Sequence, residues 1–275
     1  MWVTRLPWNS LSRCVGRLSY IRIPKSLRRP VIRGVARALG ADLNDAELPP
    51  EAFPTVQDFF VRRLRPGSRP QPECQRIITS PVDAVYSQAG TVESGKITQI
   101  KGLSYNLTEL IRNRVWADRF INGTYVTLYL QPRDYHRIHA PYTGRLAAVE
   151  HVPGLLLTVN QWGVRHVPNL FTVNERVTTF FETDVGPIAV VKIGATSVGS
   201  IRLRCCALQT NRPWNSYIYN ELDAVAPIIS RGDEIARFEL GSTVVVLFER
   251  GSVSLEPIDA GRRVRVGEPL AFPVE

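Results

Sequence analysis

The fold is decided by residues 124–131, Thr-Tyr-Val-Thr-Leu-Tyr-Leu-Gln, in which aliphatic side chains alternate with tyrosine and threonine. Successive side chains of a β-strand point to opposite faces, so an alternation with a period of two predicts a strand. Runs of similar character occur at residues 144–151, 155–160, 177–182, 187–193, 198–205 and 243–249. We therefore predict a mainly β (α+β) protein whose body is a sandwich or barrel-like sheet of short strands.

Helical signal is confined to short segments. Residues 55–64 are predicted to form a helix that has Thr55 as its cap and Asp58 in its first turn, and that ends at Pro66-Gly67. Residues 104–114 and 116–120 are the other helical candidates of the body. The acidic, proline-containing stretch 45–54 is predicted to be a linker.

Positive charge is concentrated at the N-terminus. The chain has 34 Lys+Arg and 25 Asp+Glu, yet residues 1–40 hold nine basic residues and no acid. The first acidic residue is Asp42, so the rest of the chain is formally neutral. The N-terminal arm therefore has an anionic partner, either a membrane surface or a nucleic acid.

Prolines at positions 7, 24 and 30 are expected to divide this arm into short helices, the clearest at 30–39. On a helical wheel one side is basic and the opposite side is apolar: Arg29, Arg33 and Arg37 against Val31, Ile32, Val35 and Leu39. This segregation favours a helix lying among lipid headgroups. The alternative is a helix packed on the body with a solvated basic face. Nucleic acid is the weaker third interpretation, because no nucleic-acid-binding motif accompanies the arm.

No stretch approaches the ~18 consecutive apolar residues of a spanning helix, and the start lacks the apolar core of a secretory signal. The start does resemble a mitochondrial transit peptide in being rich in Arg and Ser. The four cysteines are Cys14, Cys74, Cys205 and Cys206, with no C-x-x-C pair. We expect reduced, mostly buried thiols and a reducing compartment.

The four histidines include a pair, His136 and His139, in the segment Pro-Arg-Asp-Tyr-His-Arg-Ile-His-Ala-Pro at residues 132–141. Such a pair fits acid/base chemistry, a purely structural role or metal binding. A metal site needs further ligands, and no third one stands at a diagnostic spacing. No metal is therefore expected. His151 and His166 are interpreted as structural.

Two further segments could carry chemistry. Residues 240–243, Leu-Gly-Ser-Thr, precede an apolar strand, and residues 80–84, Ser-Pro-Val-Asp-Ala, place Asp83 after a proline turn. Each has an ordinary explanation, since Gly241 and Ser242 suit a turn and Asp83 suits a solvated loop. Taken singly, neither segment indicates an enzyme.

Taken together and in this order, residues 80–84, 132–141 and 240–243 resemble the three signature segments of the phosphatidylserine decarboxylases. The pattern of residues 53–70 also resembles the family, as do residues 168–171, 174–176 and 194–200. The resemblance runs from about residue 50 to the C-terminus. It is looser in the arm and in residues 205–232.

The resemblance implies an enzyme that decarboxylates phosphatidylserine to phosphatidylethanolamine through a Schiff base with a covalent pyruvoyl group. That cofactor derives from Ser242 after the chain cuts itself between Gly241 and Ser242. By position in the motifs, Ser242, His139 as its base and Asp83 as the orienting acid form the self-cleavage triad. His136 is then assigned to proton transfer during decarboxylation.

The resemblance further implies a basic arm at residues 1–44 and a catalytic domain at 45–275. The domain is cleaved into a large chain, 1–241, and a small chain, 242–275, which form a heterodimer and dimerise further. The expected partners are phosphatidylserine and an anionic membrane, without nucleic acid. We expect a peripheral protein on the cytoplasmic face of a bacterial membrane, in preference to the mitochondrial inner membrane.

Other functions use the same residues. A serine hydrolase could employ Asp83, His139 and Ser242, although the G-x-S-x-G elbow is missing because Thr243 and Val244 follow the serine. A lipid-binding homologue with a dead site is a second alternative. All three triad positions are filled, however, which favours the enzyme.

Overall fold

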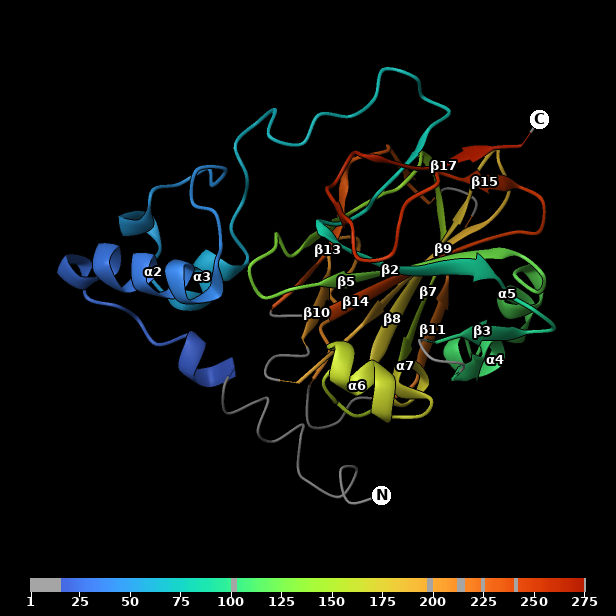
Figure 1. The fold of residues 1–275 in the computed structure, drawn as a ribbon, viewed down its shortest axis with the longest axis horizontal. Coiled ribbons are helices and arrows are strands. Elements are labelled where there is room, and N and C mark those ends of the chain that lie inside the picture. The colour runs from blue at the N-terminus through green and yellow to red at the C-terminus, as the bar shows by residue number, and fades with distance from the viewer. Residues whose placement is uncertain are drawn as a thin grey trace.

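The computed structural model describes residues 16–99, 103–196, 200–211, 216–223, 226–239 and 242–274 (Figure 1). Its helices are α2 (Lys25–Leu39), η2 (Pro50–Ala52), α3 (Val56–Phe60), α4 (Leu107–Leu110), α5 (Arg114–Arg119), α6 (Gln161–His166) and α7 (Leu170–Val173). Its strands are β1 (Ile78–Thr79), β2 (Ala84–Thr91), β3 (Lys96–Thr98), β4 (Ser104–Asn106), β5 (Thr124–Leu130), β6 (Arg137–His139), β7 (Gly144–Val152), β8 (Arg176–Glu182), β9 (Ile188–Ile193), β10 (Ile201–Leu203), β11 (Ile218–Glu221), β12 (Ile228–Ile229), β13 (Glu234–Phe238), β14 (Ser242–Phe248), β15 (Val253–Leu255), β16 (Arg263–Val264) and β17 (Pro269–Pro273). The predicted mainly β fold is confirmed.

One large antiparallel sheet organises the body. Its strands follow the order β11-β7-β8-β9-β14-β5-β2-β16, and β12 also pairs with β7. The decisive stretch 124–131 forms β5, and the apolar run 243–249 forms β14 beside it. Strand β14 lies between β5 and β9, pairing with β5 from Ser242 to Phe248. The predicted small chain, residues 242–275, therefore has its first strand in the interior of the sheet.

Each face of the large sheet is covered by a separate hydrophobic core. Along β14, Val244 and Val246 point to one face, whereas Val245 and Leu247 point to the other. The first face packs against two three-stranded sheets, β10-β13-β6 and β1-β17-β15. The second face packs against helices α4 to α7. Strands buried on both faces read as continuous apolar runs, which explains the sequence of β14.

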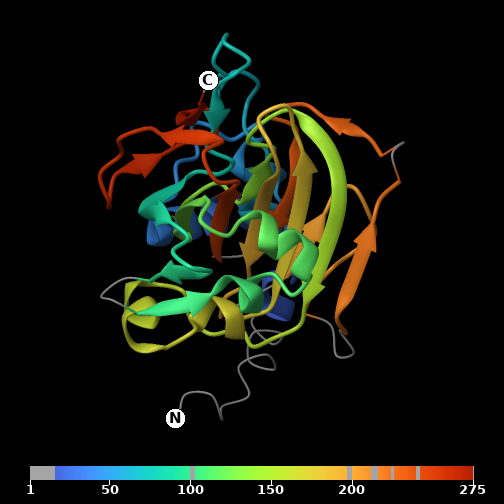
Figure 2. The same ribbon diagram turned by 90° about the vertical axis from the view of Figure 1, so that its right-hand side faces the viewer.

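The sheet is strongly curved, as the long bent strand β7 shows in Figure 2. A bulge interrupts the pairing of β7 with β8 between Leu146 and Ala148. A bulge adds one unpaired residue and bends its strand. Strands β6 and β13 pack over one face of this curved sheet.

The N-terminal helices lie beside the β body in Figure 1. Helix α2 runs through Pro30, so the predicted break at this proline is wrong. The apolar side of α2 is held by tertiary packing, since Ile32 and Ala36 are buried against Phe53 and Phe59. Such packing stabilises a helix that has lost one backbone hydrogen bond to proline. For this side of the helix, packing on the protein is the interpretation that the structure supports.

Two predicted elements differ in the structure. The helix expected at 104–114 begins as strand β4, because residues 104–106 pair with β3 in a hairpin, and only the short helix α4 follows. Residues 155–160 form no strand, apart from a single bridge between Leu155 and Asn174. Both segments are short, a case in which periodicity separates helix from strand poorly.

The prediction of mostly buried cysteines is wrong for the three that the structure describes. Cys74, Cys205 and Cys206 are free thiols, and all three are exposed. Cysteine is more often buried than exposed, but it is small and tolerates both environments. Cys14 lies outside the described residues.

Candidate active site

Ser242 opens β14 opposite Leu130, the last residue of β5. Its side chain is fully buried, and its Oγ has no hydrogen-bond partner among the described residues. Leaving a buried hydroxyl unpaired costs about 1–3 kcal/mol, so native structures rarely tolerate it without a functional reason. The predicted cleavage bond involves Gly241, which lies outside the described residues.

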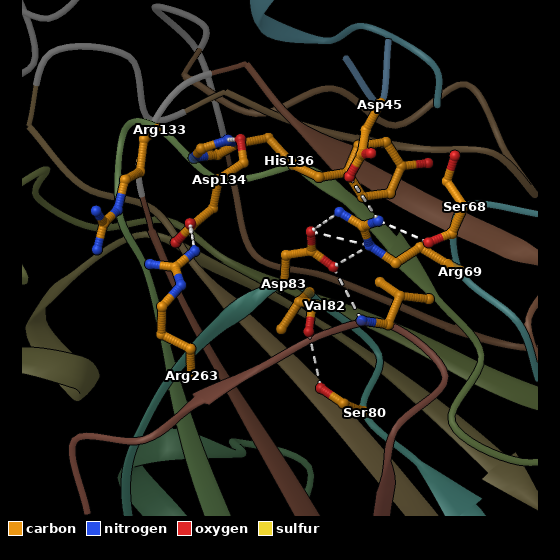
Figure 3. Close-up of polar contacts among 12 residues, drawn as sticks. Asp45, Ser68, Arg69, Ser80, Val82, Asp83, Arg133, Asp134, His136 and Arg263 are labelled. Carbon is orange, nitrogen blue, oxygen red and sulfur yellow. Dashed lines mark hydrogen bonds and ion pairs between the residues drawn. The ribbon is translucent and has the colours of Figure 1, made fainter. Parts of the chain in front are cut away.

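The segment that follows β5 carries both histidines of the motif, and it begins with a turn. Asp134 holds this turn, since its Oδ2 accepts a hydrogen bond from the Gln131 backbone N–H at 2.7 Å and its Oδ1 pairs with Arg263. Figure 3 shows the contact between Asp134 and Arg263 together with His136. The chain then enters β6, which ends at His139. The strand places the two histidines in different surroundings, and the helical turn considered from the sequence does not form.

His136 is a neutral base in a dry environment. Its Nδ1 donates to the Asp134 carbonyl oxygen at 2.8 Å, which leaves Nε2 as the acceptor nitrogen of the ring. This Nε2 is buried and has no partner in the described part of the chain. The ring packs against Phe60 in a tilted arrangement, with centroids 4.1 Å apart and an interplanar angle of 42°. Burial, together with the neighbouring Arg62, lowers the pKa of His136 to about 3.

His139 uses both ring nitrogens. Its Nδ1 donates to the Gly232 carbonyl oxygen at 2.6 Å, and its Nε2 accepts from the Tyr135 hydroxyl at 3.0 Å. Burial lowers the pKa of His139, while the carboxylates of Glu234 and Asp83 act in the opposite direction. The ring is therefore oriented by a carbonyl and a phenol.

Asp83 is bound to an arginine that the sequence analysis did not single out. Arg69 approaches it with Nε at 2.9 Å and Nη2 at 2.5 Å, and the Val266 backbone N–H donates to Asp83 at 2.9 Å (Figure 3). Arg69 is itself held by Asp45 at 3.0 Å. No hydrogen bond joins Asp83 to His139 in this arrangement. Asp83 acts on His139 through its charge.

Comparison with known sequences identifies the protein family that has these motifs. The sequence profile of the family described as phosphatidylserine decarboxylase matches residues 56–272. The chain belongs to the phosphatidylserine decarboxylase family. The resemblance drawn from the three motifs is thereby confirmed, and with it the prediction of a decarboxylase.

Individual relatives of the decarboxylase family match the chain over nearly its whole length. The phosphatidylserine decarboxylase proenzyme of Anaeromyxobacter sp. (strain K) is 44% identical, covering 96% of this chain and 94% of its own. The proenzyme of Vibrio cholerae serotype O1 is 40% identical over 97% of this chain and 95% of its own. That of Acidovorax ebreus (strain TPSY) is 42% identical over 97% and 94%.

Arg69 and Tyr135 are the polar groups of this decarboxylase site that sequence reasoning missed. Tyr135 stood within the histidine motif, and Arg69 stood within the family-like pattern at 53–70. Neither residue is unusual in a loop, and only the fold brings Arg69 to Asp83 across fourteen positions of sequence. The sequence feature that could have indicated Arg69 and Tyr135 is that each lies within a segment resembling the family.

The other two histidines lie in structural environments. His151 is buried, with Nε2 at 3.1 Å from Glu175 and Nδ1 at 3.0 Å from the Ser216 carbonyl oxygen. His166 is exposed and stacks on Trp162. Among the described residues, no three His, Cys, Asp or Glu side chains gather as they would around a metal ion.

Proposed function

We propose that this chain is a proenzyme that cleaves itself between Gly241 and Ser242 and then decarboxylates phosphatidylserine through a pyruvoyl group. Membership of the family supports phosphatidylserine as the substrate. The naming of the relatives as proenzymes supports self-processing. The observation that carries the proposal is the buried, unpartnered Oγ of Ser242 at the start of a central strand. Such an atom suits a nucleophile whose only partner is the peptide bond beside it.

Cleavage requires the Ser242 hydroxyl to attack the carbonyl carbon of Gly241 while a base takes its proton. The Gly241–Ser242 amide then becomes an ester. Loss of the Ser242 α-proton expels the Gly241 carboxylate and leaves dehydroalanine. Water then replaces the amine, which departs as ammonia. The products are a large chain ending in a carboxylate and a small chain beginning with a ketone.

His139 is the base in this proposal. It is neutral, and its Nε2 carries the lone pair that the Tyr135 hydroxyl occupies at rest. The hydrogen bond between Tyr135 and His139 must therefore break before His139 can accept the proton of Ser242. Asp83 lies close enough to favour the protonated ring electrostatically, without the hydrogen bond of a Ser-His-Asp triad.

His136 serves the decarboxylation. The pyruvoyl group supplies a ketone that captures the substrate amine and a neighbouring carbonyl that takes up electron density. Because burial lowers its pKa, His136 is unprotonated at rest, and a proton that reaches its unpartnered Nε2 is readily given up. The same nitrogen can deliver that proton to the α-carbon after carbon dioxide leaves.

Intact mass spectrometry tests the self-cleavage. The wild-type protein should yield two chains, with the fragment from residue 242 lighter by one ammonia than its sequence requires. Ser242→Ala should remain one inactive chain. Ser242→Thr is the matched control, because it keeps a hydroxyl and should cleave slowly. A wild-type chain that stays intact and reacts with a serine-directed phosphonate would instead indicate a hydrolase.

We further propose that the protein works on the cytoplasmic face of a bacterial membrane. No helix of the described residues is long and apolar enough to span a bilayer. The basic side chains of α2 are accompanied by exposed apolar ones on the same arm: Leu18, Tyr20, Ile21, Leu27 and Val31. Exposed apolar groups beside arginines suit a headgroup layer.

Vesicle flotation tests this surface. Leu18→Ser with Ile21→Ser should weaken binding to vesicles of phosphatidylglycerol and phosphatidylcholine by about a hundredfold, since roughly 1.5 kcal/mol or more is lost for each of the two buried aliphatic side chains. Val115→Ser is the matched control, because Val115 is 74% exposed on α5. Equal binding of all three proteins would remove the arm from the proposal.

A further inference from the structure

Three arginines form a row across the small sheet β10-β13-β6. Arg202 of β10 lies directly opposite Arg237 of β13, and Arg237 lies directly opposite Arg137 of β6. Residues directly opposite in an antiparallel pair project from the same face, and like charges in such positions repel. A row of this kind destabilises the sheet unless it has an anion to hold.

The protein neutralises only one end of the row. Arg137 is buried and donates to both oxygens of Glu234, at 2.9 and 2.7 Å. Arg237 is half-buried, and its Nε is shielded from water without a hydrogen-bond partner among the described residues. Arg202 is exposed, and no carboxylate of the described residues lies within ion-pair distance of Arg202 or Arg237. Two guanidinium groups are left with unused donors.

The row opens into a hollow of about 500 Å³. Its charged lining consists of Arg63, Arg137, Arg202, Arg204, Arg237 and Glu234. Guanidinium forks match the oxygens of a phosphate in pairs, and such charge-assisted hydrogen bonds are among the strongest in proteins. The hollow therefore has the size and charge to receive a phosphate group.

The hollow lies between the arm and the candidate active site. Tyr20 of the arm donates its hydroxyl to Glu239 at 3.0 Å, close enough to feel the charges of Arg202 and Arg237. Next to Arg237 along β13, the Phe238 N–H donates to the His136 carbonyl oxygen at 2.9 Å. A phosphate held here would have exposed apolar residues of the arm on one side and the histidine motif on the other. A phospholipid supplies a phosphate in that setting.

We propose that Arg202 and Arg237, the two arginines of the row that the protein does not neutralise, bind the phosphodiester of a phospholipid presented at the membrane surface. The inference rests on the proposed function and adds a binding site to it. The phosphodiester belongs either to the substrate or to a neighbouring anionic lipid. Both share the chemistry that the row recognises.

The test compares Arg202→Ala, Arg237→Ala and Arg237→Lys with wild-type protein, in processed enzyme. Arg250→Ala is the matched control, because Arg250 is an exposed arginine just past the other end of β14. Phosphatidylserine is presented in uncharged detergent micelles at increasing surface fraction. Either alanine substitution should raise KM about tenfold, as expected for loss of a charge-assisted contact. The KM of Arg237→Lys should lie between those of wild type and Arg237→Ala, and the KM of Arg250→Ala should equal that of wild type.

Two assays identify the source of the phosphate. Dihexanoyl-phosphatidylserine below its micellar concentration offers only the substrate's own phosphodiester, so a raised KM there assigns the row to the substrate. A raised KM confined to micelles that also contain phosphatidylglycerol assigns it to a neighbouring lipid. Unchanged KM in both assays overturns the inference, even if inorganic phosphate alone binds the row.

Failure of the inference and failure of the proposed function are separable. If wild-type protein neither cleaves itself nor releases carbon dioxide, the proposed function is wrong. If wild type and all variants cleave and turn over with equal KM, only the arginine site is wrong. Should Arg237→Ala fail to fold, Arg202→Ala decides alone, because Arg202 is exposed and no side-chain partner depends on it among the described residues.

Discussion

Arg69 and Asp83 form an ion pair that shows how the candidate site is held. Both side chains are largely shielded from water, with 13% and 7% of their surfaces exposed. Removing one partner of such a pair strands the other charge, which is far more costly than losing a surface pair. The pair therefore fixes the loop that carries Asp83, as well as the charge that His139 senses.

We expect Arg69→Ala to lower the free energy of unfolding by about 3 kcal/mol. Urea denaturation of the uncleaved Ser242→Ala protein measures this in a single chain. Arg119→Ala is the control, since Arg119 and Glu182 are about one-third exposed and such pairs contribute about 1 kcal/mol or less. Equal losses in the two variants would contradict the buried-pair interpretation.

The buried ring of His136 makes stability depend on pH. Its folded pKa is lowered to about 3, so the unfolded chain binds a proton as pH falls through 6.5 while the native protein does not. Stability is therefore lost as pH falls from about 6.5 towards 3, by roughly 1.4 kcal/mol per pH unit. His136→Gln in the Ser242→Ala background should remove this share of the pH dependence. If the unfolding free energies of the two proteins changed in parallel from pH 6.5 to 4.5, burial of His136 would be excluded as a cause of the pH dependence.

The residue scale is where prediction from sequence was least complete. The motifs named Ser242, His136 and His139, and in the structure Ser242 lies opposite the last residue of β5 while both histidines follow β5 along the chain. The hydrogen-bond partners of Asp83 and His139 could not be read from motifs. They come from Arg69 and Gly232, on loops whose positions depend on long-range packing.

At the scale of elements, β9 contains an unusual buried amine. Lys192 is fully buried, and its Nζ donates to Thr179 Oγ1 at 2.7 Å and to the Val190 carbonyl oxygen at 2.9 Å. Burial lowers the pKa of Lys192 to about 7. The unfolded chain therefore binds more protons between pH 7 and 10.5, and stability is lost as pH falls through that range.

We expect Lys192→Met to be more stable than its parent by a margin that grows as pH falls. The margin should widen by roughly 1.4 kcal/mol per unit between pH 10 and 8. Thermal unfolding of the Ser242→Ala background at several pH values measures it. The exposed Lys96→Met should show no such trend, and a margin independent of pH would contradict burial as the cause.

The elements that were predicted well are those whose pattern is set by two buried faces or by clean alternation. Strands β5, β9 and β14 fall within one residue of the predicted runs. Helix α3 begins after its predicted cap, since Thr55 Oγ1 accepts from the Asp58 N–H at 3.0 Å. Helix α2 was misjudged because its continuity depends on contacts with Phe53 and Phe59, which a local pattern does not contain.

At the scale of the whole molecule, the proposed cut falls in the middle of the large sheet. The segment from Ser242 onward contributes β14, β15, β16 and β17. Strand β14 pairs with β5 and β9, β16 pairs with β2, and β17 pairs with β1. The predicted boundary at residue 44 is also bridged, because the cluster around Ile32 and Phe59 joins both sides. Tertiary packing is therefore continuous across both the proposed cleavage site and the predicted domain boundary at residue 44.

We expect the two chains of the processed protein to stay together without a covalent bond. Native mass spectrometry or size exclusion should give one species containing both, and denaturant should release them in a single cooperative transition with loss of the sheet. Separation of the small chain by moderate salt alone would contradict the central position of β14. Ser242→Ala provides the covalently continuous reference.

The central position of β14 also fixes the order of events during biogenesis. Ser242 meets its surroundings only after β5 and β9 have flanked β14, and these three strands lie far apart along the chain. A nascent or misassembled polypeptide lacks that enclosure, so the scissile bond should survive in it. If the proposed self-cleavage occurs, appearance of the shorter fragment would therefore report that the strands around Ser242 have assembled.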